Sequence, residues 1–115
     1  MKENIILDKS FAFAVRIVNM YKFLTSKGEY TLSKQILRSG TSIGANITEA
    51  QRAQSKPDFI SKMSIALKEA YETEYWLRLL NATEYIEENV YTSMHNDNEE
   101  LISLLVSICK TAKEQ

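Results

Sequence analysis

The stretch RSGTSIGANITEA, residues 38–50, holds two of the chain's three glycines in a pattern that is otherwise typical of a helix. Three interpretations are open: a phosphate-binding loop, a bent helix, or a helix with one thin face that allows close approach. A phosphate-binding loop needs a preceding strand and a closing Gly-Lys-Ser/Thr, whereas Gly44 is followed by Ala45 and Asn46. We therefore place the stretch within a helix, with Gly40 and Gly44 on one flank of its apolar face.

Around this stretch, apolar residues at spacings of three and four predict four helices, at about 9–27, 32–54, 57–81 and 92–112. Asp8 is the expected N-cap of the first helix, and Gly28 is expected to follow its end. Pro57 suits the first turn of the third helix, with Ser55 or Lys56 near the cap. We expect an all-α fold, an antiparallel up-down-up-down four-helix bundle that forms a single domain over residues 1–115.

The apolar stripe of each predicted helix indicates which side chains form the core. In chain order these are Phe11, Val15, Val18 and Tyr21; Leu32, Ile36, Ile43, Ile47 and Ala50; Phe59, Met63, Ala66, Ala70, Thr73 and Leu77; and Met94, Leu101, Leu104, Leu105 and Ile108.

The charge of the chain is unevenly distributed. Residues 1–62 carry a formal +5 and residues 63–115 carry −6, although the whole chain has a net charge of only −1. Such asymmetry either steers RNA or an acidic partner to one face or reflects oppositely charged helices packing together. A lone cysteine, no signal-like start and no apolar run of about 20 residues predict a cytoplasmic protein without membrane contact.

Several kinds of chemistry lack the residues that they need. A di-iron bundle needs Glu-x-x-His pairs, and the Glu69–Glu72 pair has the spacing but no histidine. His95 is expected to face solvent and Cys109 to fill a small apolar space. No base is positioned for a serine or cysteine nucleophile, so carboxylate acid–base chemistry is the only enzyme route left, and nothing in the sequence marks a pocket for it. We expect no enzyme activity, no metal, no cofactor and no small-molecule substrate.

A helical projection places a polar stripe beside the apolar face of each of the two central helices. If these helices form an antiparallel hairpin, Glu49 lies opposite Lys62, Asn46 opposite Ile65 and Ser42 opposite Glu69. Arg38 then lies opposite Glu72 or Thr73. The pairing is compatible with an ordinary hairpin edge, with a contact to another subunit, or with a ligand-facing surface. We call this set the polar seam: Arg38, Ser39, Ser42, Asn46, Glu49, Lys62, Glu69, Glu72 and Trp76.

The segments QILRSGTSIGANITEA (35–50) and DFISKMSIALKEAYETEYWLRLL (58–80) resemble the bacterial 23S rRNA intervening-sequence proteins. The resemblance extends over about residues 8–110 and is weakest in 81–92 and the last helix. It implies a small four-helix bundle that assembles as a ring-shaped homopentamer, and it matches the family's polar positions to the polar seam. A more distant related bundle is an accessory to a retroelement reverse transcriptase.

Two functions follow as hypotheses. The first is a non-catalytic homopentameric module that presents a surface to a macromolecular partner. The alternative is an accessory protein that binds RNA, or a nucleic-acid-processing protein, through the basic first half. The candidate basic residues are Arg16, Lys22, Lys27, Lys34, Arg38, Arg52, Lys56 and Lys62.

Overall fold

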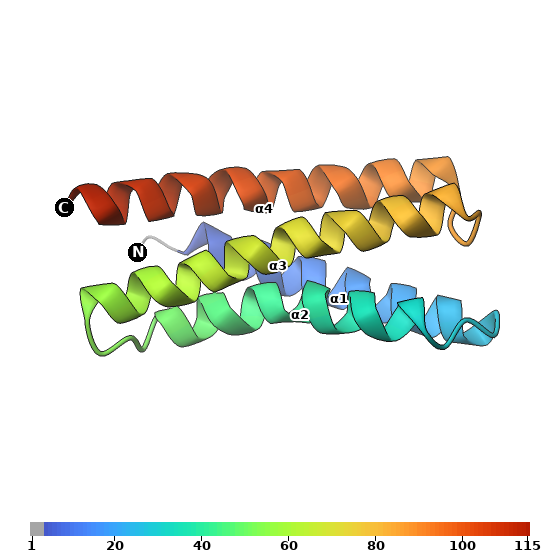
Figure 1. Cartoon of the computed structure of the whole chain (residues 1–115), viewed down its shortest axis with the longest axis horizontal. Coiled ribbons are helices and arrows are strands. Elements are labelled where there is room, and N and C mark those ends of the chain that lie inside the picture. Colours follow the sequence, from blue (N-terminus) through green and yellow to red (C-terminus); the bar gives the residue numbers. More distant parts are fainter. Residues whose placement is uncertain (1–3) are drawn as a thin grey trace.

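The computed structural model describes residues 4–115 as four helices: α1 Ile5–Ser26, α2 Leu32–Ala50, α3 Lys56–Ala82 and α4 Glu88–Glu114. They run alternately up and down, and both chain ends lie at one end of a bundle measuring 46 × 23 × 21 Å (Figure 1). Each helix packs against its neighbours in the sequence, and α4 returns beside α1. The described residues contain no strand. The all-α four-helix fold expected from the periodicity is confirmed.

The helix boundaries differ from the predicted ones mainly at capping sites. The first helix begins at Ile5, so Asp8 lies in its first turn and is not its N-cap. The second ends at Ala50 and not at 54, because the chain makes a turn and enters the next cap. Ser55 is that cap, since its hydroxyl accepts a hydrogen bond from the Asp58 N–H at 3.1 Å, and Pro57 lies in the first turn as expected.

The predicted polar connection between the third and fourth helices is shorter than expected. The third helix continues to Ala82 and the fourth begins at Glu88, four residues before the predicted start. Between them Glu84 has φ of +70°, a left-handed conformation that Gly28 also adopts with φ of +85° after α1. Gly28 fits the expected helix-ending role because glycine has no Cβ to strain there.

The first helix is rotated relative to the expectation. Phe11 is 71% exposed and Val15 46%, whereas Phe13 and Ile17 are buried. The prediction of the core-facing stripe was therefore wrong for this helix. Two overlapping apolar stripes exist on α1, and periodicity alone does not select between them. The buried stripe consists of Ile6, Ser10, Phe13, Ile17, Met20 and Leu24.

The other three helices contribute the core positions that their periodicity indicated, with Leu32, Phe59, Leu104 and Ile108 only partly buried. Full burial of one such aliphatic side chain stabilises a fold by about 1.5–3 kcal/mol. The fully buried members include Ile36, Ile43, Ile47, Ala66, Ala70, Leu77 and Leu105. Among the described helices none combines the length and apolar character needed to cross a bilayer.

Candidate polar seam and neighbouring surfaces

The polar seam begins at Arg38 on α2, whose guanidinium lies between two carboxylates of α3. It donates to Glu69 Oε1 at 3.2 Å and to Glu72 Oε2. Glu72 also accepts a hydrogen bond from the Trp76 indole N–H at 3.0 Å. The expected pairing of Arg38 with Glu72 is therefore confirmed, and one carboxylate joins an arginine to an aromatic ring.

Below these exposed groups lies a buried polar contact. The hydroxyls of Ser39 and Thr73 hydrogen bond at 2.9 Å, and both residues are fully buried. Thr73 also donates to the Glu69 carbonyl one turn earlier at 2.8 Å. Because a buried hydroxyl without a partner is costly, this contact favours one register between α2 and α3. Ser39 thus belongs to the helix interface, while Arg38 belongs to the surface.

The middle of the seam does not cross between the helices. Ser42 Oγ donates to the Arg38 carbonyl at 2.6 Å, and Asn46 Nδ2 donates to the Ser42 carbonyl at 2.9 Å. Both side chains thus bond to their own helix one turn back, a habit of short polar residues. No hydrogen bond is found between Ser42 and Glu69 within the described part of the chain, although the register placed them opposite each other.

At its far end the seam closes with a second ion pair. Lys62 Nζ lies 3.0 Å from Glu49 Oε1, as the hairpin register predicted. The hydrogen bond and charge of Glu49 raise the pKa of Lys62. The two ion pairs therefore lie at opposite ends of the seam, with hydroxyl and amide groups between them.

The two glycines face away from the polar seam, toward α1. A Cβ on Gly40 would lie 2.6–2.9 Å from three side-chain carbons of Ile17, and one on Gly44 would lie 3.4 Å from the Ser10 carbonyl oxygen. Of the interpretations open from the sequence, close helix approach is the one that the geometry supports. That approach occurs inside one chain, between α1 and α2.

Four of the eight candidate basic residues already contact groups of the same chain. Arg38 and Lys62 belong to the seam pairs, Arg16 contacts Asp97 at 2.6 Å, and Lys56 donates to the Gln115 carbonyl. Lys9 likewise contacts Glu100 at 2.9 Å. The basic α1 and the acidic α4 therefore attract each other directly, one of the two explanations for the charge asymmetry. The remaining candidates are Lys22, Lys27, Lys34 and Arg52.

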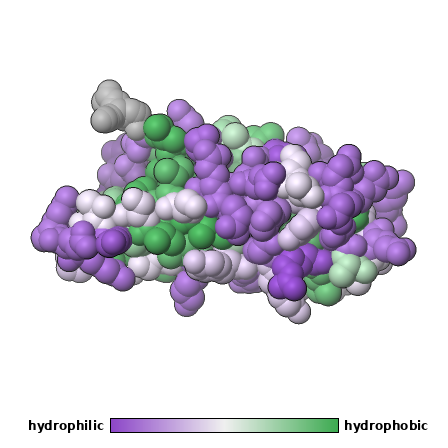
Figure 2. Space-filling view, turned by 90° about the horizontal axis from the view of Figure 1, so that it is seen from above, coloured by the Kyte–Doolittle hydropathy of each residue, from purple (hydrophilic) through white to green (hydrophobic). Residues whose placement is uncertain are grey.

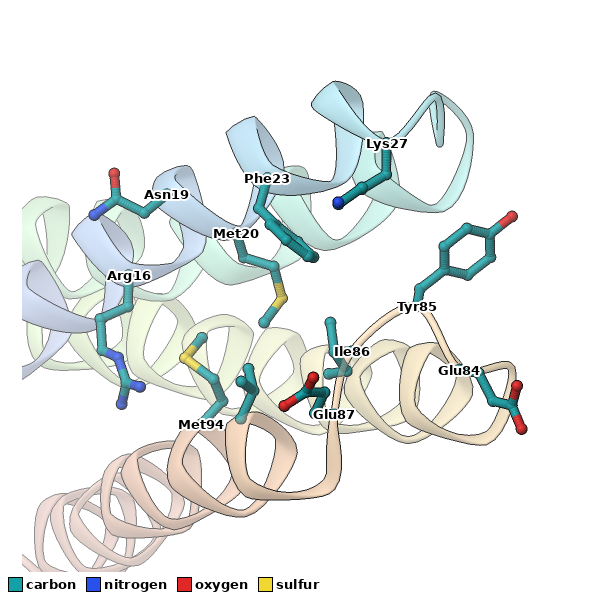
Figure 3. A pocket seen from close by; sticks show the side chains of 11 residues that line it. Arg16, Asn19, Met20, Phe23, Lys27, Glu84, Tyr85, Ile86, Glu87 and Met94 are labelled. Atoms are coloured by element: carbon teal, nitrogen blue, oxygen red, sulfur yellow. The ribbon is translucent and has the colours of Figure 1, made fainter.

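A groove of about 780 Å³ opens between α1, the α3–α4 connection and the start of α4. In Figure 3 Met20 of α1 and Met94 of α4 extend toward each other from opposite walls. Phe23 and Ile86 add apolar surface, and Arg16 lies at one end. Candidate basic residues Arg16 and Lys27 therefore border an apolar groove and do not form a continuous basic surface.

Two polar centres were missed at the sequence level. Glu29, only 8% exposed, accepts hydrogen bonds from the backbone N–H groups of Thr31, Leu32 and Ser33 at 3.2, 2.9 and 2.6 Å. Burial pushes the pKa of Glu29 upward, but these donors together lower it. The carboxylate thereby caps the start of α2. An acidic residue directly after the helix-ending Gly28 was the available signal.

The second missed centre is Glu74, which faces α4. It accepts a hydrogen bond from Tyr91 Oη at 2.6 Å and lies 2.9 Å from His95 Nδ1. Burial, followed by the bond to Glu74, raises the pKa of Tyr91 to about 12. The expectation that His95 faces solvent was wrong, because its side chain is 34% exposed and contacts the neighbouring helix. The earlier start of α4 places Tyr91 in the helix, one turn before His95, and both side chains contact Glu74 of α3.

The chain was compared with known protein families and with solved structures. The family model of the 23S rRNA-intervening sequence proteins matches residues 2–107. The chain belongs to that family. The crystal structure of a protein of unknown function from the S23 ribosomal protein family of Bacteroides thetaiotaomicron, at 1.70 Å resolution, superposes with a TM-score of 0.91. That protein is 63% identical, and the match covers 92% of this chain and 99% of that one. No curated protein matches the sequence.

Proposed function

We propose that this 23S rRNA-intervening sequence family member is a non-catalytic, homopentameric assembly module. The observation that supports it most directly is the outward stripe of α1, where Phe11, Val15 and Val18 are 71%, 46% and 36% exposed. These residues follow each other at spacings of four and three, so they share one helix face. An apolar stripe of this kind favours contact with another protein surface.

A ring requires two different surfaces on each subunit, because a head-to-tail contact joins unlike patches. A second outward surface lies on α3, where Tyr71 and Tyr75 are 54% and 55% exposed. The α1 and α3 helices are diagonal in the bundle, and their backbones are not neighbours. The two surfaces therefore face different directions, which suits closure into a ring. We propose that the α1 stripe of one copy packs on the α3 tyrosines of the next.

The space-filling view gives a related picture of surface polarity. Figure 2 shows an apolar patch near the end where the termini lie, bordered by hydrophilic side chains. Exposed apolar side chains also lie on other helices, among them Tyr71 of α3 and Val106 of α4. Aromatic residues such as Phe11 and Tyr75 are the types enriched where protein surfaces meet.

The alternative, binding of RNA through the basic first half, has less support. Three of its eight candidate cations, Arg16, Arg38 and Lys62, form intrachain ion pairs, and Arg16 and Lys27 border an apolar groove. Phosphate contacts need free Lys or Arg side chains and weaken as salt increases. We therefore place assembly first and make RNA binding the competing outcome.

Light scattering coupled to size exclusion tests the proposal. We expect the wild-type chain to have five times its 13.2 kDa mass. The double variant Phe11→Ser/Val15→Ser should keep its helical circular dichroism and lose the assembly. Val106→Ser on α4 is a matched control, since Val106 is 44% exposed, and it should remain pentameric. A wild-type monomer at micromolar concentration would disprove the proposal.

The competing outcome is measured on the same samples. A mixed-sequence RNA is titrated into the wild-type protein at low and high salt, and into Lys22→Gln/Lys34→Gln. Tight binding that falls steeply with salt and weakens in this variant would favour the RNA hypothesis over the assembly module.

A further inference from the structure

On the side of α3 away from the seam, one side chain of α3 and three of α4 form a compact polar cluster. Tyr91, His95 and Glu99 follow at intervals of four, so they lie along one face of α4. Glu74 of α3 lies opposite and contacts Tyr91 and His95 at 2.6 and 2.9 Å. We propose that Glu74, His95 and Glu99 bind a divalent transition-metal ion of the Zn²⁺ class, which joins α3 to α4.

The spacing of the donor atoms suits such an ion. One ligand atom from each of the three residues lies within 4.8 Å of the other two. Zn²⁺ binds nitrogen and oxygen at 2.0–2.2 Å, so two ligands of a tetrahedral ion are about 3.3 Å apart. That separation falls between the 2.9 Å of the His95–Glu74 contact and the outer limit of the cluster. Glu99 is exposed, so its side chain can rotate inward and bring its carboxylate oxygen from within 4.8 Å of the other ligand atoms to about 3.3 Å.

The chemistry of the donors selects the ion. One imidazole and two carboxylates form a mixed nitrogen–oxygen set, which suits Zn²⁺ and its neighbours better than Mg²⁺ or Ca²⁺, whose sites consist of oxygen. Three protein ligands leave one tetrahedral position for water. The two carboxylates also supply negative charge that a dication offsets.

Burial and a hydrogen bond hold the proposed ligand Glu74 in place. The Glu74 side chain is only 17% exposed, and its second oxygen accepts the hydrogen bond from Tyr91. Partners of this kind fix the orientation of metal-binding carboxylates, and their loss typically costs 10–100-fold in affinity. Tyr91 is therefore a positioning residue, not a ligand. The site uses α3 and α4 residues that contact each other, and Tyr91 lines a groove that also includes Tyr75 of the proposed assembly surface.

Titration of the untagged full-length chain with Zn²⁺ alone, followed by calorimetry, tests the site. We expect one ion per chain and a Tm that increases with Zn²⁺ concentration, since binding to the folded state stabilises it. Co²⁺ should give the visible absorption of a four-coordinate ion. Glu99→Gln and His95→Gln should each weaken binding at least 10-fold, and Tyr91→Phe about 10-fold.

Glu100→Gln is the matched control, because it removes the same charge from the next position, where Glu100 contacts Lys9 of α1. It should leave Zn²⁺ affinity unchanged. Glu99 is exposed, so its variant should fold like the wild type even if His95→Gln does not. The proposal is overturned if Co²⁺ shows no four-coordinate spectrum, or if Glu99→Gln binds Zn²⁺ as the wild type does.

Discussion

Gly40 of α2 lies against Ile17 of α1 so closely that a Cβ on the glycine would be 2.6 Å from Ile17 Cγ1. Ile17 is fully buried, and the contacted carbons include two bonded directly to its own Cβ. No rotation of a distant side-chain end relieves such a contact. The helix therefore needs glycine here, although glycine within a helix costs about 1 kcal/mol relative to alanine.

This relationship predicts opposite outcomes for the two helical glycines. Gly40→Ala should lower the free energy of unfolding by about 1–3 kcal/mol, because an extra methyl group overpacks the α1–α2 interface. Gly44→Ala should be neutral or stabilising by up to about 1 kcal/mol, because its Cβ would be at ordinary contact distance, 3.4 Å, from Ser10. Urea denaturation of both variants at one protein concentration measures the difference. Equal losses of unfolding free energy in the two variants would contradict the assignment of Gly40 as the position of close helix approach.

Removal of Arg38 tests whether the polar seam is only a surface feature of one chain. Arg38 is 49% exposed, and exposed ion pairs stabilise by about 1 kcal/mol or less. Arg38→Met should therefore lower the free energy of unfolding by at most about 1 kcal/mol, and by less in high salt.

Arg52→Met, at an exposed position just after α2, is the control for a lost arginine. A loss above about 3 kcal/mol for Arg38→Met alone would mean that the seam becomes buried, as in a subunit interface. The polar seam would then belong to the assembly and not to a free surface.

The sequence predicted the hairpin of α2 and α3 well because several independent signals agree there. Ser55 and Pro57 mark the helix start, and the antiparallel register then brings Arg38 to Glu72 and Lys62 to Glu49. A register is a geometric consequence of helix direction and turn position. It needs no knowledge of the rest of the bundle.

The prediction from sequence was wrong where two orientations of a helix fit the same apolar periodicity. On α1 the stripe of Phe11 and Val15 and the stripe of Phe13 and Ile17 are both apolar, and only packing against α2 buries the second. The small surface of Gly40 selects Ile17, which is a tertiary effect. The cluster around Glu74 was missed because periodicity does not tell how α4 is rotated against α3, and because Tyr91 precedes the predicted start of this helix.

Glu29 predicts a specific acid dependence. Burial raises the pKa of this carboxyl, but hydrogen bonds from the backbone of Leu32, Ser33 and Thr31 outweigh burial and lower it. A lowered pKa in the folded state means that the ionised group contributes stability above the ordinary pKa of glutamate, and that this contribution is lost as pH falls through the lowered value. Glu29→Gln should cost about 0.5–2 kcal/mol at neutral pH, as loss of a helix cap does.

The difference between wild type and Glu29→Gln should shrink as the pH is lowered into the acidic range. Urea midpoints measured from neutral pH downward follow it. Glu114→Gln, at the exposed end of α4, should parallel the wild type throughout. If the difference in urea midpoint between wild type and Glu29→Gln stays constant with pH, the charge of Glu29 is not what caps α2.

Tyr91 predicts a loss of stability at alkaline pH. Its pKa is raised to about 12, first by burial and then by the hydrogen bond to Glu74. Because the folded state holds the phenol neutral, the stability that it contributes is complete below the ordinary tyrosine pKa of about 10 and is lost as pH rises through about 12. Tyrosine ring signals in NMR, followed against pH, should show that Tyr91 titrates near 12, well above the ordinary tyrosine pKa of about 10.

In Glu74→Gln the pKa of Tyr91 should move down toward 10, because the negative charge that opposes phenolate formation is gone, while burial keeps part of the shift. Tyr91→Phe should cost about 1 kcal/mol at neutral pH, the usual loss for one hydrogen bond, and this cost should vanish at high pH. Tyr71→Phe, which removes an exposed hydroxyl, should change neither the pKa of Tyr91 nor the free energy of unfolding. A late-titrating signal that persists in Tyr91→Phe would assign the raised pKa to another tyrosine and leave the Glu74 contact without support.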